Sequence, residues 1–203
     1  MKKSVPVAHE SYPDTHHDNY SRTTFGFWLY IMSDFILFGA LFAAYIVLSK
    51  STFGGPAAKT LFKLPYNFLQ TCIFLVSALT AGLGGASAHR KDKNKTLLFF
   101  AATFLLGVIF IGMQFNEFHR FSSGGNGWDQ SAFLSAYFTL VGTHSIHVLF
   151  GLLWIIVLLL PVWNETGISH VSVRRLTCLR MFWQFLNIIW MLIFSFVYLM
   201  GAK

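Results

Sequence analysis

Charged side chains are scarce in this sequence. Only 11% of the 203 residues are Asp, Glu, Lys or Arg, whereas 55% are hydrophobic. A soluble domain carries roughly a quarter charged residues, so this chain has too few charges to cover a globule with a hydrated surface. The composition therefore excludes a soluble enzyme and indicates an integral membrane protein.

Acidic residues are the scarcest of the charged groups, with eight Asp and Glu against 15 Lys and Arg and a net charge of +7. In nucleic-acid-binding proteins such an excess gathers on one basic face. Here the basic residues lie in short segments between long apolar runs, which is typical of membrane proteins. This distribution excludes nucleic acid as a partner.

Cysteine is nearly absent, and the two that occur, Cys72 and Cys178, lie within or beside apolar runs. There is no C-x-x-C pair, so the sequence gives no signal for a zinc or thioredoxin-type site. Nucleotide-binding glycine-rich loops, G-x-S-x-G and H-E-x-x-H are also missing. The sequence therefore predicts neither catalytic residues nor a metal site in this chain.

Five apolar runs are long enough to cross a bilayer, which needs about 20 residues. Their apolar character is continuous rather than alternating, so transmembrane helices are favoured over barrel strands. The runs are about 25–49, 66–88, 97–121, 131–163 and 176–200. We predict an all-α membrane protein, a bundle of five transmembrane helices spanning residues 25–203. Residues 1–24 are polar, rich in His and without an apolar signal region, and are predicted to form a cytoplasmic tail.

Basic residues predict the orientation of this bundle. Ten Lys and Arg lie in the tail, at residues 90–95 and at residues 174–180, whereas five lie on the other side. Segments rich in Lys and Arg stay in the cytoplasm. The N-terminus is therefore expected to be cytoplasmic and the C-terminus periplasmic.

Asp34 is the most notable polar residue, because it lies about 14 Å into the first run at helical rise. An isolated ionised carboxylate is costly at that depth, so Asp34 is expected to be protonated or paired. It could serve as a hydrogen-bonded packing group or as a proton-exchanging carboxylate, and the sequence leaves both interpretations open.

Two further polar pairs have i, i+3 spacing, which places both members on one helix face. His144 and His147 could ligate a metal, but a haem–copper core needs more His than the runs contain, so an interhelical hydrogen-bond network is favoured. Gln184 and Asn187 form the second pair. All reach a depth similar to that of Asp34, so we predict that Asp34 hydrogen-bonds to at least one of these four side chains, directly or through water.

Gln114 and Glu117 share a face near the outer end of the third run. Glu117 is followed three residues later by Arg120, which suggests a local ion pair among the lipid headgroups. We interpret both as solvated, interfacial polar residues.

Several segments resemble subunit III of the haem–copper oxidases, over nearly the whole chain after the tail. The ending Val197-Tyr-Leu-Met-Gly201 is most similar to the cytochrome o ubiquinol oxidase branch. The other matching segments are Phe25-Gly-Phe-Trp-Leu-Tyr-Ile-Met-Ser-Asp34, Phe110-Ile-Gly-Met-Gln-Phe-Asn-Glu-Phe118, Gly142-Thr-His-Ser-Ile-His-Val148 and Phe182-Trp-Gln-Phe-Leu-Asn-Ile-Ile-Trp190.

The resemblance implies a non-catalytic subunit of a proton-pumping respiratory oxidase in the bacterial inner membrane. Such a subunit holds no haem, copper or quinone, because the haems and copper reside in subunit I. It supports the assembly and sustained turnover of subunit I, in a complex with subunits II and IV, and it contacts membrane phospholipids.

The resemblance also assigns individual residues. Asp34 matches the buried carboxylate of the family, and His144 and His147 match its T-H-x-x-H pair. Gln184 and Asn187 stand where the family commonly has His and Asp. These two differences remove ionisable groups and argue against a proton relay through the last helix.

Three alternatives stay open at this point. Subunit III of a short-form cytochrome c oxidase and the related subunit beside nitric oxide reductases are equally short. A stand-alone transporter that uses Asp34 as its proton site is more remote, because internal repeats and helices broken by Gly or Pro at mid-membrane are not evident.

Overall fold

The described part of the chain is helical. A computed structural model describes residues 15–49, 51, 64–125, 127–164 and 168–201, with side chains from residue 21 onward. The last helix continues into a π-helical turn, η1. The helices are α1 (Thr15–Leu48), α3 (Leu64–His89), α4 (Lys93–Ser123), α5 (Ala132–Asn164), α6 (His170–Ile193) and η1 (Phe194–Leu199).

Five of these segments are long and apolar enough to cross a membrane, which confirms the predicted fold class. The largest differences are at the starts of the first and last spans. Helix α1 begins at Thr15, inside the segment 1–24 that was predicted to be a tail, and residues 1–14 lie outside the described part. Helix α6 begins at His170, six residues before the predicted span, because Ser169 caps it by accepting a hydrogen bond from the backbone N–H of Ser172 at 3.2 Å.

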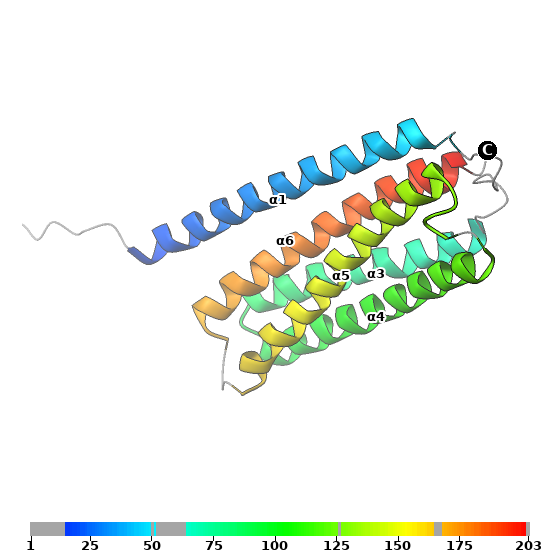
Figure 1. Ribbon diagram of the computed structural model, residues 1–203. Helices are drawn as coiled ribbons and strands as arrows, with labels where there is room; N and C mark the ends of the chain where they lie inside the picture. The colour runs from blue at the N-terminus through cyan, green and yellow to red at the C-terminus, as the bar shows by residue number, and fades with distance from the viewer. Residues whose placement is uncertain (1–14, 50, 52–63, 126, 165–167, 202–203) are drawn as a thin grey trace, which may run out of the picture.

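Successive helices run in opposite directions, so the start of α1 and the end of α6 lie at opposite ends of the bundle (Figure 1). An odd number of spans requires this arrangement. Which end faces the cytoplasm stays a prediction from the basic residues.

Helices α3, α4, α5 and α6 form the main bundle, and α1 packs against one side of it. The most extensive packing joins α3 to α4, followed by α3 with α6 and α5 with α6. Helix α1 contacts α5 and α6, at the edge of the bundle in Figure 1. Large apolar side chains on its outer face, such as Phe25, Ile36 and Val47, stay exposed, as expected for a surface that meets lipid.

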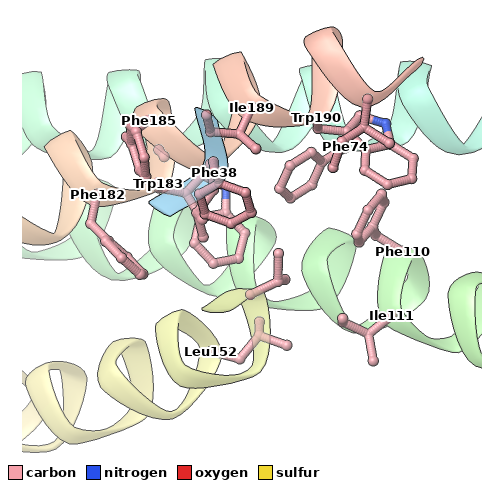
Figure 2. Packing of buried hydrophobic residues seen from close by; sticks show 14 of the residues in the cluster. Phe38, Phe74, Phe110, Ile111, Leu152, Phe182, Trp183, Phe185, Ile189 and Trp190 are labelled. Carbon is pink, nitrogen blue, oxygen red and sulfur yellow. The ribbon is translucent and has the colours of Figure 1, made fainter. Parts of the chain in front are cut away.

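Stacked aromatic side chains fill the centre of the bundle (Figure 2). The ring of Phe110 on α4 stacks on Phe74 of α3 at 4.2 Å and meets Trp190 of α6 edge-on at 4.7 Å. Both central indoles donate hydrogen bonds to hydroxyl groups on α3. Trp183 reaches Ser77 Oγ at 3.0 Å and Trp190 reaches Thr71 Oγ1 at 3.1 Å. These bonds set the register of α6 against α3, because an unpaired indole N–H is costly away from water.

Candidate functional site

Asp34 and His147 meet between α1 and α5. Asp34 Oδ2 lies 3.8 Å from His147 Nε2, and the two side chains are 12% and 19% exposed. This is an ion-pair distance, longer than a hydrogen bond. Of the four candidate partners of Asp34, His147 is therefore the one that the structure places beside it, without a direct hydrogen bond.

The other ring nitrogen of His147 determines what the pair can do. His147 Nδ1 lies 2.8 Å from the carbonyl oxygen of Thr143. Since a carbonyl can only accept, Nδ1 carries a proton and Nε2 faces Asp34. At 3.8 Å, Nε2 and Asp34 Oδ2 are too far apart for a direct hydrogen bond. The ring is thus oriented so that Nε2 is the nitrogen available to Asp34.

Aromatic rings surround this pair. The Phe38 ring lies 5.3 Å from the His147 ring and the Phe182 ring lies 6.5 Å from it. Tyr30, one turn before Asp34, interacts with the carboxylate through its hydroxyl group. The aromatic walls limit access of water, which strengthens electrostatic contacts between the polar groups inside.

His144 points elsewhere, although it shares a helix face with His147. Its Nε2 donates a hydrogen bond of 3.1 Å to the Leu186 carbonyl on α6, and its side chain is fully buried. The rings of Phe74, Phe110 and Trp190 lie 5.8, 6.0 and 5.2 Å away. His144 therefore makes an interhelical hydrogen bond of the kind that the sequence favours over ligation of a metal.

Gln184 and Asn187 are not part of the Asp34 contact. Gln184 Nε2 donates to the Ala78 carbonyl on α3 at 2.9 Å, and Asn187 Nδ2 donates to the Trp183 carbonyl at 3.2 Å. Among the described contacts, none joins either amide to Asp34. The predicted polar layer is therefore divided, with Asp34 and His147 on the α1 side and Gln184 on the α3 side of α6.

Glu117 and Gln114 require a correction. We expected solvated, interfacial side chains, but both residues are only 1% exposed, in the interior between α3, α4, α5 and η1. Tyr198 of η1 donates a hydrogen bond to Glu117 Oε2 at 2.9 Å, and the hydroxyl groups of Tyr198 and Tyr137 lie 3.0 Å apart. The solvated interpretation was wrong because tertiary packing brings the two tyrosines over this face of α4.

The cluster around Glu117 extends to α3. Gln114 donates to Glu117 Oε2 at 3.4 Å and accepts from Gln70 at 2.8 Å. The expected partner Arg120 lies 3.9 Å from Glu117 Oε1, with a third of its side chain exposed. Sequence reasoning missed Gln70, Tyr137 and Tyr198. A polar residue within an apolar run and a tyrosine near a helix end were the available signals, but neither identifies its partner.

The described residues contain no group of three or more His, Cys, Asp or Glu that could hold a metal ion. The two described polar sites thus consist of one carboxylate–histidine pair and one carboxylate–tyrosine–amide cluster. Both sites join helices of the bundle.

Comparison with known proteins gives a consistent assignment. The family model of cytochrome c oxidase subunit III matches residues 6–202. A relative in Pseudomonas aeruginosa, "Cytochrome bo(3) ubiquinol oxidase subunit 3", is 47% identical over all of this chain and 97% of its own length. A Pseudomonas putida protein of the same name is 42% identical over 92% of this chain and 89% of its own length. "Cytochrome c oxidase subunit 3" of Bacillus sp. strain PS3 is 39% identical over 87% of this chain and 84% of its own length. Because the family model covers almost the whole chain, this five-helix membrane protein belongs to the cytochrome c oxidase subunit III family.

Proposed function

We propose that this chain is the non-catalytic subunit III of a terminal ubiquinol oxidase of the cytochrome o type, which pumps protons while reducing oxygen. The observation that carries the proposal is the relationship over the full length, at 47% identity, to a protein named as subunit 3 of a ubiquinol oxidase. The relative named for cytochrome c is less similar, at 39%. The choice of ubiquinol as the electron donor therefore rests on the higher identity to the first of these two relatives.

The proposed partners follow from this assignment. The chain binds oxidase subunit I, which carries the haems and copper, in a complex with subunits II and IV and with phospholipids of the bacterial inner membrane. Five apolar spans support a multi-pass membrane location. The N-terminus is proposed to face the cytoplasm, on the basis of the ten-to-five division of basic residues.

Within this function we assign Asp34 and His147 to packing of the bundle. Their contact joins the peripheral helix α1 to α5. A buried carboxylate beside His147 could instead exchange a proton. We propose the packing role, and proton exchange is the alternative that the variants below distinguish from it.

Purification of the tagged chain from its native membrane in mild detergent tests the proposal. We expect haem-bearing subunits to co-purify and the preparation to oxidise ubiquinol. A preparation that oxidises cytochrome c but not ubiquinol would favour the cytochrome c branch, and a chain that purifies alone would favour the transporter.

The absorbance of the separated subunit provides a second test. We expect the isolated chain to be colourless, because the haems are assigned to subunit I. Deleting the chain should leave the haem spectrum of the assembled subunit I essentially unchanged. A haem band that travels with this chain alone would contradict the assignment.

A further inference from the structure

Arg180 lies inside the membrane-spanning part of α6 and has no acidic partner among the described residues. Its side chain packs across Gly85 of α3, where an added Cβ would lie 2.5 Å from Arg180 Cδ. Arg180 is partly exposed, on the outer face formed by α3 and α6. A cation in this position requires an acceptor, because lipid tails provide none.

The position of Arg180 along the bundle is fixed by a neighbouring contact. Thr177 Oγ1 lies 3.5 Å from Nε2 of His89, which is the last residue of α3. Arg180 follows Thr177 by almost one turn, about 5 Å deeper into the bundle. It is thus at the inner edge of the apolar region rather than in the basic loop.

Gln184 is a second polar residue on this face of α6, one turn deeper than Arg180. One of its amide N–H bonds is used by the Ala78 carbonyl at 2.9 Å, and its side-chain carbonyl oxygen has no partner among the described residues. Gln184 borders a groove of about 340 Å³, whose other lining residues are Ala78, Leu79, Gly82 and Leu83. Small residues at Ala78 and Gly82 leave room for a close approach to the α3 backbone.

The outer surfaces around Ser33 on α1 and Thr139 on α5 differ from this face. Exposed hydroxyl groups there are satisfied within their own helix, as Ser33 is by the Tyr30 carbonyl at 2.7 Å and Thr139 by the Ser135 carbonyl at 2.8 Å. Their neighbours are large apolar side chains that suit acyl chains, such as Ile36. The α3–α6 face combines a cation, an amide acceptor and a groove with a small-residue floor.

We propose that the α3–α6 groove, defined by Ala78, Leu79, Gly82, Leu83 and Gln184, binds a transmembrane helix of another subunit of the same oxidase. That helix carries an Asp or Glu opposite Arg180 and a hydrogen-bond donor opposite Gln184. A carboxylate forms a bidentate, charge-assisted pair with a guanidinium. A protein helix satisfies both polar groups, whereas an acyl chain leaves the Gln184 carbonyl unpaired. This inference rests on the proposed function, since it needs a multi-subunit oxidase.

Photo-cross-linking in the assembled oxidase tests the proposal. A benzophenone side chain at Leu83, which is 44% exposed, is expected to cross-link to a helix of a co-purifying oxidase subunit. Mass spectrometry of the adduct should place an Asp or Glu about one turn from the attachment point. The same probe at Ile36, which is 73% exposed on α1, reports the background of lipid adducts. Capture of phospholipid alone at Leu83 would assign the groove to lipid and overturn the proposal.

Substitution of Arg180 provides an independent measurement. We expect the Arg180→Leu subunit to dissociate from the detergent-solubilised oxidase about tenfold faster, because loss of one charged partner chiefly raises the dissociation rate. Arg180→Lys should retain most of the wild-type stability, and reversal of the partner's carboxylate together with Arg180→Glu should restore it. Arg175→Leu on the same helix is the matched control. Equal dissociation rates for the Arg180→Leu and Arg175→Leu subunits would overturn the proposal. The proposed function would be unaffected by that result, because it is tested separately by co-purification of haem-bearing subunits with the unmodified chain.

Discussion

At the scale of single residues, two substitutions of Asp34 distinguish a packing role from a proton-exchanging role. Asp34→Asn keeps the size and hydrogen-bonding capacity of the side chain but cannot exchange a proton. Asp34→Ala removes one partner of a buried polar contact, which costs about 1–3 kcal/mol. We expect the Asn variant to match wild type in retention on the oxidase and in sustained turnover, and the Ala variant to lose both.

The competing protonic role gives a different pattern. If Asn and Ala variants both assemble normally but lose proton uptake or sustained turnover, Asp34 is a proton-exchanging carboxylate. Assembly is measured by the ratio of this subunit to haem after purification, and turnover by oxygen consumption over repeated additions of ubiquinol.

Tyr198 provides a second residue-scale prediction, because its hydroxyl group donates to the buried Glu117 at 2.9 Å. Tyr198→Phe removes this donor and leaves a buried carboxylate oxygen less satisfied. We expect the free energy of unfolding to fall by about 1–3 kcal/mol, measured by detergent-induced unfolding in mixed micelles.

Tyr45→Phe is the matched control for Tyr198→Phe. Tyr45 is also buried, at 3% exposure, but no hydrogen bond of its hydroxyl group is found among the described residues. We expect this substitution to change the free energy of unfolding by less than about 0.5 kcal/mol. Equal losses in the two variants would show that the bond to Glu117 contributes nothing specific.

At the scale of helices, the approach of α4 to α5 and α6 depends on Gly107. An added Cβ at this position would lie 2.8 Å from Leu152 Cδ2 and 2.9 Å from the Trp183 ring. Gly107→Ala is therefore expected to overpack the interface and to lower the free energy of unfolding by about 1–3 kcal/mol.

Gly112, on the same helix, tests whether this loss comes from packing or from the residue type. No atom lies within 4 Å of an added Cβ at Gly112. Gly112→Ala should leave the free energy of unfolding unchanged or raise it by up to about 1 kcal/mol, since Ala favours the helix. If the two alanine variants had the same stability, the close contact at Gly107 would not be limiting.

The turn η1 is a second element-scale feature, and it determines where the end of the last helix points. Phe194–Leu199 is π-helical, which inserts extra residues into the helical turn. Tyr198 lies in this segment and reaches Glu117 on α4 from it. The turn therefore joins the end of the last span to the buried cluster.

At the scale of the whole molecule, the positive charges predict how the bundle sits in the membrane. A reporter enzyme fused after Lys203 should be active on the periplasmic side, whereas one inserted at Lys93 should be active on the cytoplasmic side. The two fusion points follow the end of η1 and mark the start of α4 in the sequence, and these two helix ends lie at opposite ends of the described bundle. The reverse pattern would show that the basic loops do not set the orientation.

The number and approximate limits of the five spans could be predicted, because a stretch of about 20 apolar residues has no other stable place than a bilayer. The ends were less accurate, since α1 begins at Thr15 and α6 begins at His170, both in polar sequence, and Ser169 caps the start of α6. The depth of Asp34 predicted that it is protonated or paired, and the structure places His147, one of its predicted neighbours, beside it.

Partners across the bundle could not be predicted, because spacing along a helix gives the face of a side chain but not the helix that this face meets. Gln184 and Asn187 share a depth with Asp34, yet rotation of α6 turns Gln184 towards Ala78 on α3. Glu117 resembled a surface residue in sequence because Arg120 follows it. The structure buries it, since η1 brings Tyr198 over it.

The sequence by itself determined that this protein spans the membrane five times and belongs to the subunit III family, because both follow from apolar length and from ordered motifs along one chain. The tertiary structure alone decided which polar groups meet. It paired Asp34 with His147, separated Gln184 from both, buried Glu117 among tyrosines and left Arg180 facing outward. These outcomes depend on helix rotation and on the close approaches that Gly85 and Gly107 permit, which are properties of packed surfaces rather than of the order of residues.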